Sequence, residues 1–247
     1  MFQIQSFTCE GLRDHLVTDC AAPTFAYFVS SDRAGASVQS AELTVNGWTI
    51  RNPDQCGTRY AGQPLKPFTT YTATLTVTSD SGETDTARLT FETGRMDTPW
   101  QGKWITDGAY VFKEKKVSPV PMVFHKALPL RGEIAWAKLY ATAMGIYELN
   151  IDGQKVGERY FAPGFTSYAH QLMYQTYDVT DMLHSGSCIT ATVAGGWAVG
   201  SFVFTRVNRV TADRQALLAE LRITYRDGRT EVIGTDESWQ VTEDGPV

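Results

Sequence analysis

Residues 71–91 read YTATLTVTSDSGETDTARLTF, and this stretch decides the fold class of the N-terminal part of the chain. Apolar side chains alternate with polar ones over residues 71–77, and the alternation returns over residues 87–91. A period of two residues is typical of a β-strand with one buried face. The turn-forming segment Asp80-Ser81-Gly82 lies between the two runs, so the stretch predicts an antiparallel hairpin.

Further strands are predicted upstream of this hairpin, over residues 24–29 and 41–45. The spacing Leu65-x-Pro67-x-Thr69-x-Tyr71 is similar to the tyrosine corner of fibronectin type III domains, in which a tyrosine hydroxyl bonds to the backbone. We therefore predict a fibronectin type III or immunoglobulin-like β-sandwich over residues 1–95. Such sandwiches carry many unrelated roles, and a structural spacer is the interpretation that we favour here.

A second domain is predicted over residues 96–247, after the polar linker Arg95-Met96-Asp97-Thr98-Pro99. Residues 134–141 alternate as a strand. Residues 147–156 read YELNIDGQKV, and their central Asp152-Gly153 pair is the signal of a two-residue type I′ hairpin.

Residues 215–221 (QALLAEL) resemble a helix by composition, but their periodicity is that of a strand. One face of this strand carries Leu217, Ala219, Leu221, Ile223 and Tyr225. The other face carries Glu220 and Arg222. Strands are also predicted over residues 189–193 and 231–233. The whole chain is thus predicted to be all-β, with an antiparallel sandwich of jelly-roll type as its second domain.

Composition excludes several classes of partner. The 247 residues are 43% hydrophobic and carry a net charge of -5 with no cluster of lysine and arginine, so we expect no nucleic-acid partner. No apolar run approaches the roughly 20 residues that span a bilayer, so we expect no membrane partner. The first ten residues lack the pattern of an export signal, which favours the cytoplasm. A periplasmic or secreted location stays open if a signal peptide has been removed.

Four cysteines are present, namely Cys9, Cys20, Cys56 and Cys188, and no two of them form a CxxC pair. No histidine lies at metal-ligand spacing from them, so no metal site is predicted. We expect free thiols. A disulfide between Cys9 and Cys20 is the alternative in an oxidising compartment.

Several strings of the second region together resemble the N-terminal β-domain of bacterial α-L-rhamnosidases of glycoside hydrolase family 78. Their order and spacing carry the resemblance more than any one of them. The strings are AKLY (137–140), GIYELNIDG (145–153), VG (156–157), PGFTSY (163–168), YQTYDVT (174–180), GGW (195–197) and SW (238–239).

The resemblance implies a parent enzyme that hydrolyses terminal α-L-rhamnosyl groups with inversion, by two carboxylic acids on a helical (α/α)6 barrel. An inverting pair is held roughly 6.5 to 9.5 Å apart on a rigid scaffold, and this chain contains no such barrel. We therefore predict no catalytic residues here. For Asp178 and Asp181, at a predicted helical turn, we favour a capping role. The abrupt end at Asp244-Gly245-Pro246-Val247 is expected to be a truncation.

The leading hypothesis is an accessory N-terminal fragment of an α-L-rhamnosidase, which supports the missing C-terminal catalytic domain and binds a rhamnose-containing glycan or glycoside. An independent carbohydrate-binding or adhesion module is the alternative, and a spacer without ligand is a third. Several hundred further residues of helical pattern in the reading frame would favour the first of these.

The candidate sugar-binding aromatics are Trp197, beside Gly195-Gly196, and the group Phe165, Tyr168 and Tyr160. An aromatic face can stack on the apolar side of a pyranose. For Phe165 and Tyr168 we favour packing in the core over sugar binding.

The resemblance also implies a calcium-dependent rhamnose site just after the Val-Gly pair of the hairpin, where this chain has Glu158-Arg159. A guanidinium beside the glutamate opposes a divalent cation. We therefore predict no cofactor, with calcium held by Glu158 as the alternative, and Glu158 and Arg159 stay candidate sugar-binding residues.

Overall fold

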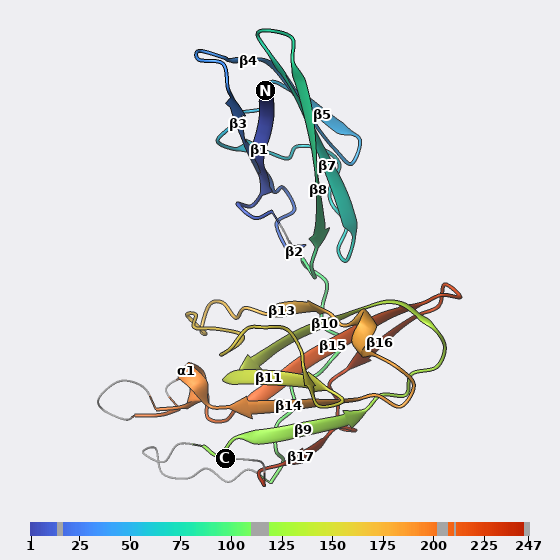
Figure 1. Ribbon diagram of the computed structural model, residues 1–247. Helices are drawn as coiled ribbons and strands as arrows, with labels where there is room; N and C mark the ends of the chain where they lie inside the picture. Colours follow the sequence, from blue (N-terminus) through green and yellow to red (C-terminus); the bar gives the residue numbers. More distant parts are fainter. Residues whose placement is uncertain (14–16, 110–118, 202–206, 210, 245–247) are drawn as a thin grey trace. The chain divides into compact units, whose positions relative to one another are not determined.

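The computed structural model describes residues 1–13, 17–109, 119–201, 207–209 and 211–244. The predicted truncation after Asp244 therefore lies outside the described residues. The chain divides into two units, Met1–Pro99 and Trp100–Val247. Both units consist of β-sheets (Figure 1). Their strands pair antiparallel, apart from the parallel pair of β2 and β8 in the first unit. The prediction of an all-β chain with two successive β-sandwiches is confirmed.

The first unit has two sheets that face each other across a core of apolar side chains. Their strand orders are β1-β3-β6 and β2-β8-β7-β4-β5. The strands are β1 (Phe2–Cys9), β2 (Val17–Thr18), β3 (Thr24–Ser31), β4 (Val38–Val45), β5 (Trp48–Arg51), β6 (Thr58–Arg59), β7 (Thr70–Ser79) and β8 (Thr84–Thr93).

The hairpin predicted from residues 71–91 is formed by β7 and β8. Phe91 is fully buried, and its ring lies 5.7 Å from that of Phe25 and 5.6 Å from that of Tyr71, measured between centroids. The Tyr71 hydroxyl accepts a hydrogen bond of 2.7 Å from the backbone N–H of Lys66. The predicted bond from this tyrosine to the upstream backbone is confirmed.

The second unit also has two sheets, with strand orders β13-β10-β15-β16 and β12-β11-β14-β9-β17. The inner faces of both sheets supply one apolar core. The strands are β9 (Met122–Ala127), β10 (Ile134–Met144), β11 (Ile146–Ile151), β12 (Gln154–Lys155), β13 (Gln175–Asp178), β14 (Cys188–Ala194), β15 (Ala216–Tyr225), β16 (Thr230–Gly234) and β17 (Gln240–Thr242). The described part of this unit also has two short helices, η1 (Thr180–Met182) and α1 (Gly196–Val199).

The ambiguous stretch before Tyr225 is β15, a central strand, as its period predicts. It pairs with β10 over almost its whole length and with β16 on the other side. Leu217, Leu221 and Tyr225 are buried in the core. On the outer face, Glu220 is fully buried, pairs with Arg222 and accepts a hydrogen bond of 2.8 Å from the Gln101 backbone N–H. This bond ties the start of the second unit to β15.

The predicted type I′ hairpin joins β11 to β12, with φ of 50° at Asp152 and 80° at Gly153. The Asp152 carboxylate accepts a hydrogen bond of 2.8 Å from the Cys188 backbone N–H and pairs with His184 at 3.2 Å. The Cys188 backbone, then the Ser187 and Cys188 side chains and finally His184, lower the pKa of Asp152. The turn is therefore anchored to the start of β14.

A single residue, Gly145, carries the chain from one sheet of the second unit to the other, because β10 ends at Met144 and β11 begins at Ile146. Its φ of 137° is one that other residues rarely adopt. The sandwich thus depends on glycine at this crossing.

The four cysteines carry free thiols in the structure, so the alternative disulfide between Cys9 and Cys20 is not formed. Burial raises the pKa of the Cys9 thiol to about 12. None of the helices in the described ranges is long and apolar enough to cross a membrane.

Candidate functional site

A cluster of exposed aromatic side chains lies on the second unit, where the connection between β12 and β13 approaches α1. The Trp197 ring lies 6.1 Å from that of Phe165 and 6.2 Å from that of Phe161, and both pairs meet edge to face. Phe161 is 63% exposed, Phe165 61% and Trp197 36%. We call these three residues the aromatic cluster. An exposed apolar group of this kind marks an interaction site more often than a scattered surface residue does.

Backbone contacts hold the connection against the sheet. The Tyr147 N–H donates a hydrogen bond of 2.7 Å to the Ala162 carbonyl, and the Gln175 side-chain amide donates one of 3.1 Å to the Pro163 carbonyl. Ala162 and Pro163 are buried, whereas Phe161 before them is exposed. The base of the aromatic cluster is therefore fixed by β11 and β13.

Three buried or half-buried polar groups form a network beneath this connection. The Tyr147 hydroxyl donates a hydrogen bond of 2.9 Å to the side-chain amide oxygen of Gln175 and lies 3.1 Å from the Tyr177 hydroxyl. Burial raises the pKa of Tyr147 far above its usual range, and it also raises the pKa of Tyr177. Both phenols stay protonated, and the Tyr177 ring packs against Gly157, which has no room for a side chain.

The structure corrects one prediction within this group. Core packing was favoured for Phe165 and Tyr168, but Phe165 is largely exposed because it lies on the outer side of the connection. Tyr168 is half-buried, its ring lies 6.2 Å from that of Phe165, and its hydroxyl donates a hydrogen bond of 3.2 Å to the Gly164 carbonyl. Tyr168 therefore supports Phe165 from the side.

Trp197 lies on the short helix α1. Gly196 has a φ of 48° and sits against Ile146, where a side chain would collide. Ala198 and Val199 are fully buried, so the turn of the helix directs Trp197 to the surface. Gly196 thus allows a close approach of α1 to β11.

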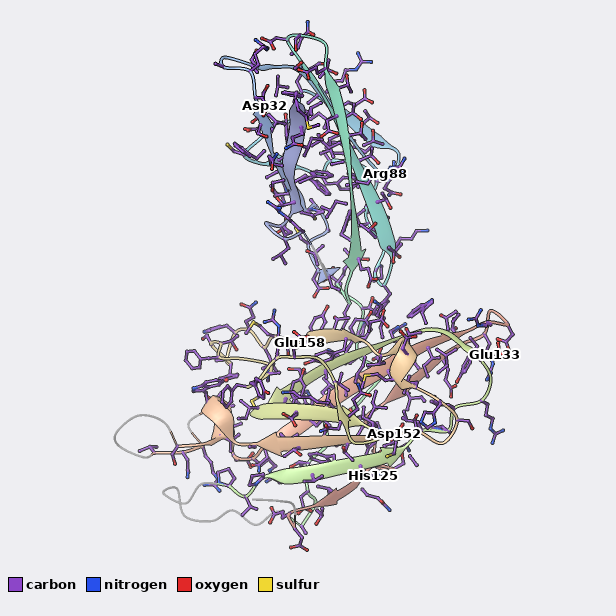
Figure 2. All side chains as sticks on the ribbon, in the orientation of Figure 1. Asp32, Arg88, His125, Glu133, Asp152 and Glu158 are labelled. Atoms are coloured by element: carbon purple, nitrogen blue, oxygen red, sulfur yellow. The ribbon has the colours of Figure 1, made fainter. Side chains whose placement is uncertain are left out.

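Glu158 and Arg159 are both exposed on the connection after β12, and Figure 2 labels the glutamate there. Across the described part of the chain, no group of three histidine, cysteine, aspartate or glutamate residues is placed to hold a metal ion. Hard cations such as Ca²⁺ take six to eight oxygen ligands. The described residues around Glu158 therefore do not fit a calcium site.

Sequence reasoning missed Phe161 and Lys155. The Lys155 ammonium lies 3.3 Å from the ring centroid of Tyr160, which is 74% exposed, and 3.2 Å from the Glu148 carboxylate. The adjacent aromatics Tyr160 and Phe161 in a polar segment were the available signal for Phe161. Asp178 has a structural role, because its carboxylate accepts hydrogen bonds from the amide and hydroxyl of Thr180, the first residue of η1.

Comparison with known proteins gives matches along both units. Residues 132–247 match the family model described as the alpha-L-rhamnosidase N-terminal domain, and residues 4–97 match the Rha78A-like N-terminal immunoglobulin domain. An alpha-L-rhamnosidase of Streptomyces avermitilis is 39% identical over 116 residues, which is 47% of this chain and 11% of that protein. One of Formosa agariphila is 30% identical over 163 residues, which is 64% of this chain and 18% of that protein.

Solved structures agree over both units. The alpha-L-rhamnosidase of Aspergillus terreus matches with a TM-score of 0.87 and 25% identity, covering 98% of this chain and 29% of that one. The enzyme of Streptomyces avermitilis shares the fold, with a TM-score of 0.82 and 18% identity. The chain spans only 11% to 18% of the length of the two curated relatives above.

Proposed function

We propose that this chain is the accessory part of an enzyme that hydrolyses terminal α-L-rhamnosyl groups. The premise is that it carries the N-terminal immunoglobulin-like domain and the N-terminal β-sandwich domain of an alpha-L-rhamnosidase. Its two domains support a catalytic domain that lies elsewhere in the parent protein. The observation that carries the proposal is the coverage: the chain matches almost completely, but to less than a third of the Aspergillus terreus enzyme.

The test compares this chain with the protein encoded by its full natural reading frame. We expect release of the chromophore from an aryl α-L-rhamnoside by the longer protein and none by the 247-residue chain. The reason is that inverting hydrolysis needs two carboxyl groups roughly 6.5 to 9.5 Å apart on a rigid scaffold. Activity in the short chain would contradict the accessory role. Activity in neither would favour an independent carbohydrate-binding or adhesion module.

The aromatic cluster supports a second step of the proposal, which is binding of rhamnosides by the β-sandwich domain. Rhamnose is a 6-deoxy sugar with an apolar face, and an exposed indole offers it a stacking surface. Phe161 and Phe165 hold the Trp197 ring from two sides. Glu158 and Arg159 are close in sequence to Phe161 and exposed, so they are the candidate partners for the sugar hydroxyls.

Replacement of Trp197 by alanine is expected to weaken binding of methyl α-L-rhamnoside by about tenfold, because the stacking surface is lost. Isothermal titration calorimetry on the 247-residue chain measures this. Trp136→Ala is the matched control, since Trp136 is 38% exposed, close to the 36% of Trp197, but lies on β10. Equal loss in both variants, or unchanged affinity in Trp197→Ala, would remove the cluster from the proposal.

A further inference from the structure

A line of polar side chains, one from each strand, crosses the outer face of the sheet β12-β11-β14-β9-β17. Asn150 lies opposite Lys155 on one side and opposite Thr190 on the other. Thr190 lies opposite His125, and His125 lies opposite Gln240. We call these five residues the polar row. Figure 1 shows β11, β14 and β9 side by side in one layer, and Figure 2 labels His125 on β9.

The polar row points away from the core of the sandwich. Successive residues of a strand face opposite sides of the sheet, and the strand neighbours of the row are buried between the two sheets. These neighbours include Leu149, Ile151, Ile189, Ala191 and Phe124. The side chains of the row are therefore presented on the outer surface of the domain.

The hydrogen-bonding groups in the middle of the row are free to meet a ligand. The side chains of Asn150, Thr190 and His125 are half-buried, and none of them makes a hydrogen bond with another residue of the described ranges. Partly desolvated amide, hydroxyl and imidazole groups gain most from a partner that brings its own donors and acceptors. A ligand rich in hydroxyl groups fits this requirement.

Both ends of the row are shaped. At one end the ring of Tyr160 covers the Lys155 ammonium with one face and is largely exposed, so it offers its other face to a ligand. At the other end there is a shallow hollow, which is lined by Val123, His125, Gln240, Val241 and Thr242. The row therefore runs from an aromatic surface to a depression.

We infer that the polar row is a binding track for an extended, neutral oligosaccharide. The only charge in the row is Lys155, which the Glu148 carboxylate neutralises at 3.2 Å, so the track has no attraction for phosphates or acidic chains. Strands lie about 4.8 Å apart, so five strands span roughly 19 Å, the length of a short oligosaccharide rather than of one sugar. This track is distinct from the aromatic cluster and does not rest on the proposed rhamnoside site.

The test titrates the 247-residue chain by calorimetry with neutral oligosaccharides of increasing length built from glucose, galactose, mannose or rhamnose. Affinity is expected to rise from the disaccharide to the tetrasaccharide and then to level off. Thr190→Ala is expected to weaken binding of the tetrasaccharide by about fivefold, and a double Asn150→Ala/His125→Ala variant by more than about tenfold. Thermal unfolding monitored by circular dichroism verifies that both variants fold.

Thr224→Ala is the matched control, because Thr224 is also a half-buried threonine on the outer face of a central strand, but in the opposite sheet. Its affinity is expected to stay unchanged. The inference is overturned if no oligosaccharide binds, if affinity is independent of length, or if Thr190→Ala and Thr224→Ala behave alike. Loss of oligosaccharide binding in Trp197→Ala with the row variants unaffected would overturn it too, while leaving the proposed rhamnoside site intact.

Discussion

Replacing Phe91 with alanine lowers the free energy of unfolding of the first unit by an expected 3 to 5 kcal/mol, about the cost of a large cavity in a closed core. The Phe91 side chain is fully buried on β8 and contacts the rings of Phe25 and Tyr71, which come from β3 and β7. It therefore joins both sheets of the sandwich, and no neighbour can fill the space without leaving its own position. Chemical denaturation followed by fluorescence and circular dichroism measures the loss.

Phe28→Ala is the matched control for this prediction. Phe28 lies on β3 of the same unit but is 61% exposed, so its removal is expected to change the free energy of unfolding by less than about 0.5 kcal/mol. Calorimetry adds a second readout, since only the transition of the first unit is expected to move in Phe91→Ala. A similar loss in both variants, or an equal shift of both units, would contradict the placement of Phe91 at the centre of a separate core.

The elements that the sequence predicts correctly are those whose signal is local. The type I′ turn at Asp152 and Gly153 follows from two residues that tolerate positive φ. The strand that ends at Tyr225 follows from a period of two, although its composition favours a helix. In each case the residues that carry the signal are neighbours in the chain, so no knowledge of the tertiary structure is needed.

The site is less predictable because its residues meet through tertiary contacts. Trp197 and Phe165 were both candidates, but only the packing of α1 beside the connection after β12 brings their rings together. Core packing was the wrong expectation for Phe165, since apolar character does not reveal which side of a connection faces solvent. The polar row could not be foreseen at all, because the strand order β12-β11-β14-β9-β17 is not the order of the sequence.

The crossing between the two sheets of the second unit supplies the other large effect. Gly145→Ala is expected to lower the free energy of unfolding of this unit by more than about 3 kcal/mol. Two causes add at this position. A φ of 137° is unfavourable for alanine, and the new Cβ would lie closer than 3.0 Å to the Ala194 carbonyl oxygen, which is backbone and cannot rotate away.

Gly153→Ala separates these two causes. Gly153 also has a positive φ, of 80°, but a Cβ there would meet nothing within 4 Å. Alanine at this turn should cost only about 1 to 2 kcal/mol, the backbone contribution alone. Denaturant midpoints of the two variants, measured side by side, give the comparison.

The difference between the two glycine variants bears on the architecture of the domain. If Gly145→Ala costs no more than Gly153→Ala, the backbone of β14 has room to retreat from the crossing, and the two sheets are less tightly joined than the structure has them. If Gly145→Ala costs more, the steric contribution is located at Ala194, the residue of β14 that pairs with Ile146. Only Gly195 separates β14 from α1, so this crossing also sets where Trp197 lies. The larger cost should therefore be accompanied by weaker rhamnoside binding in Gly145→Ala and unchanged binding in Gly153→Ala.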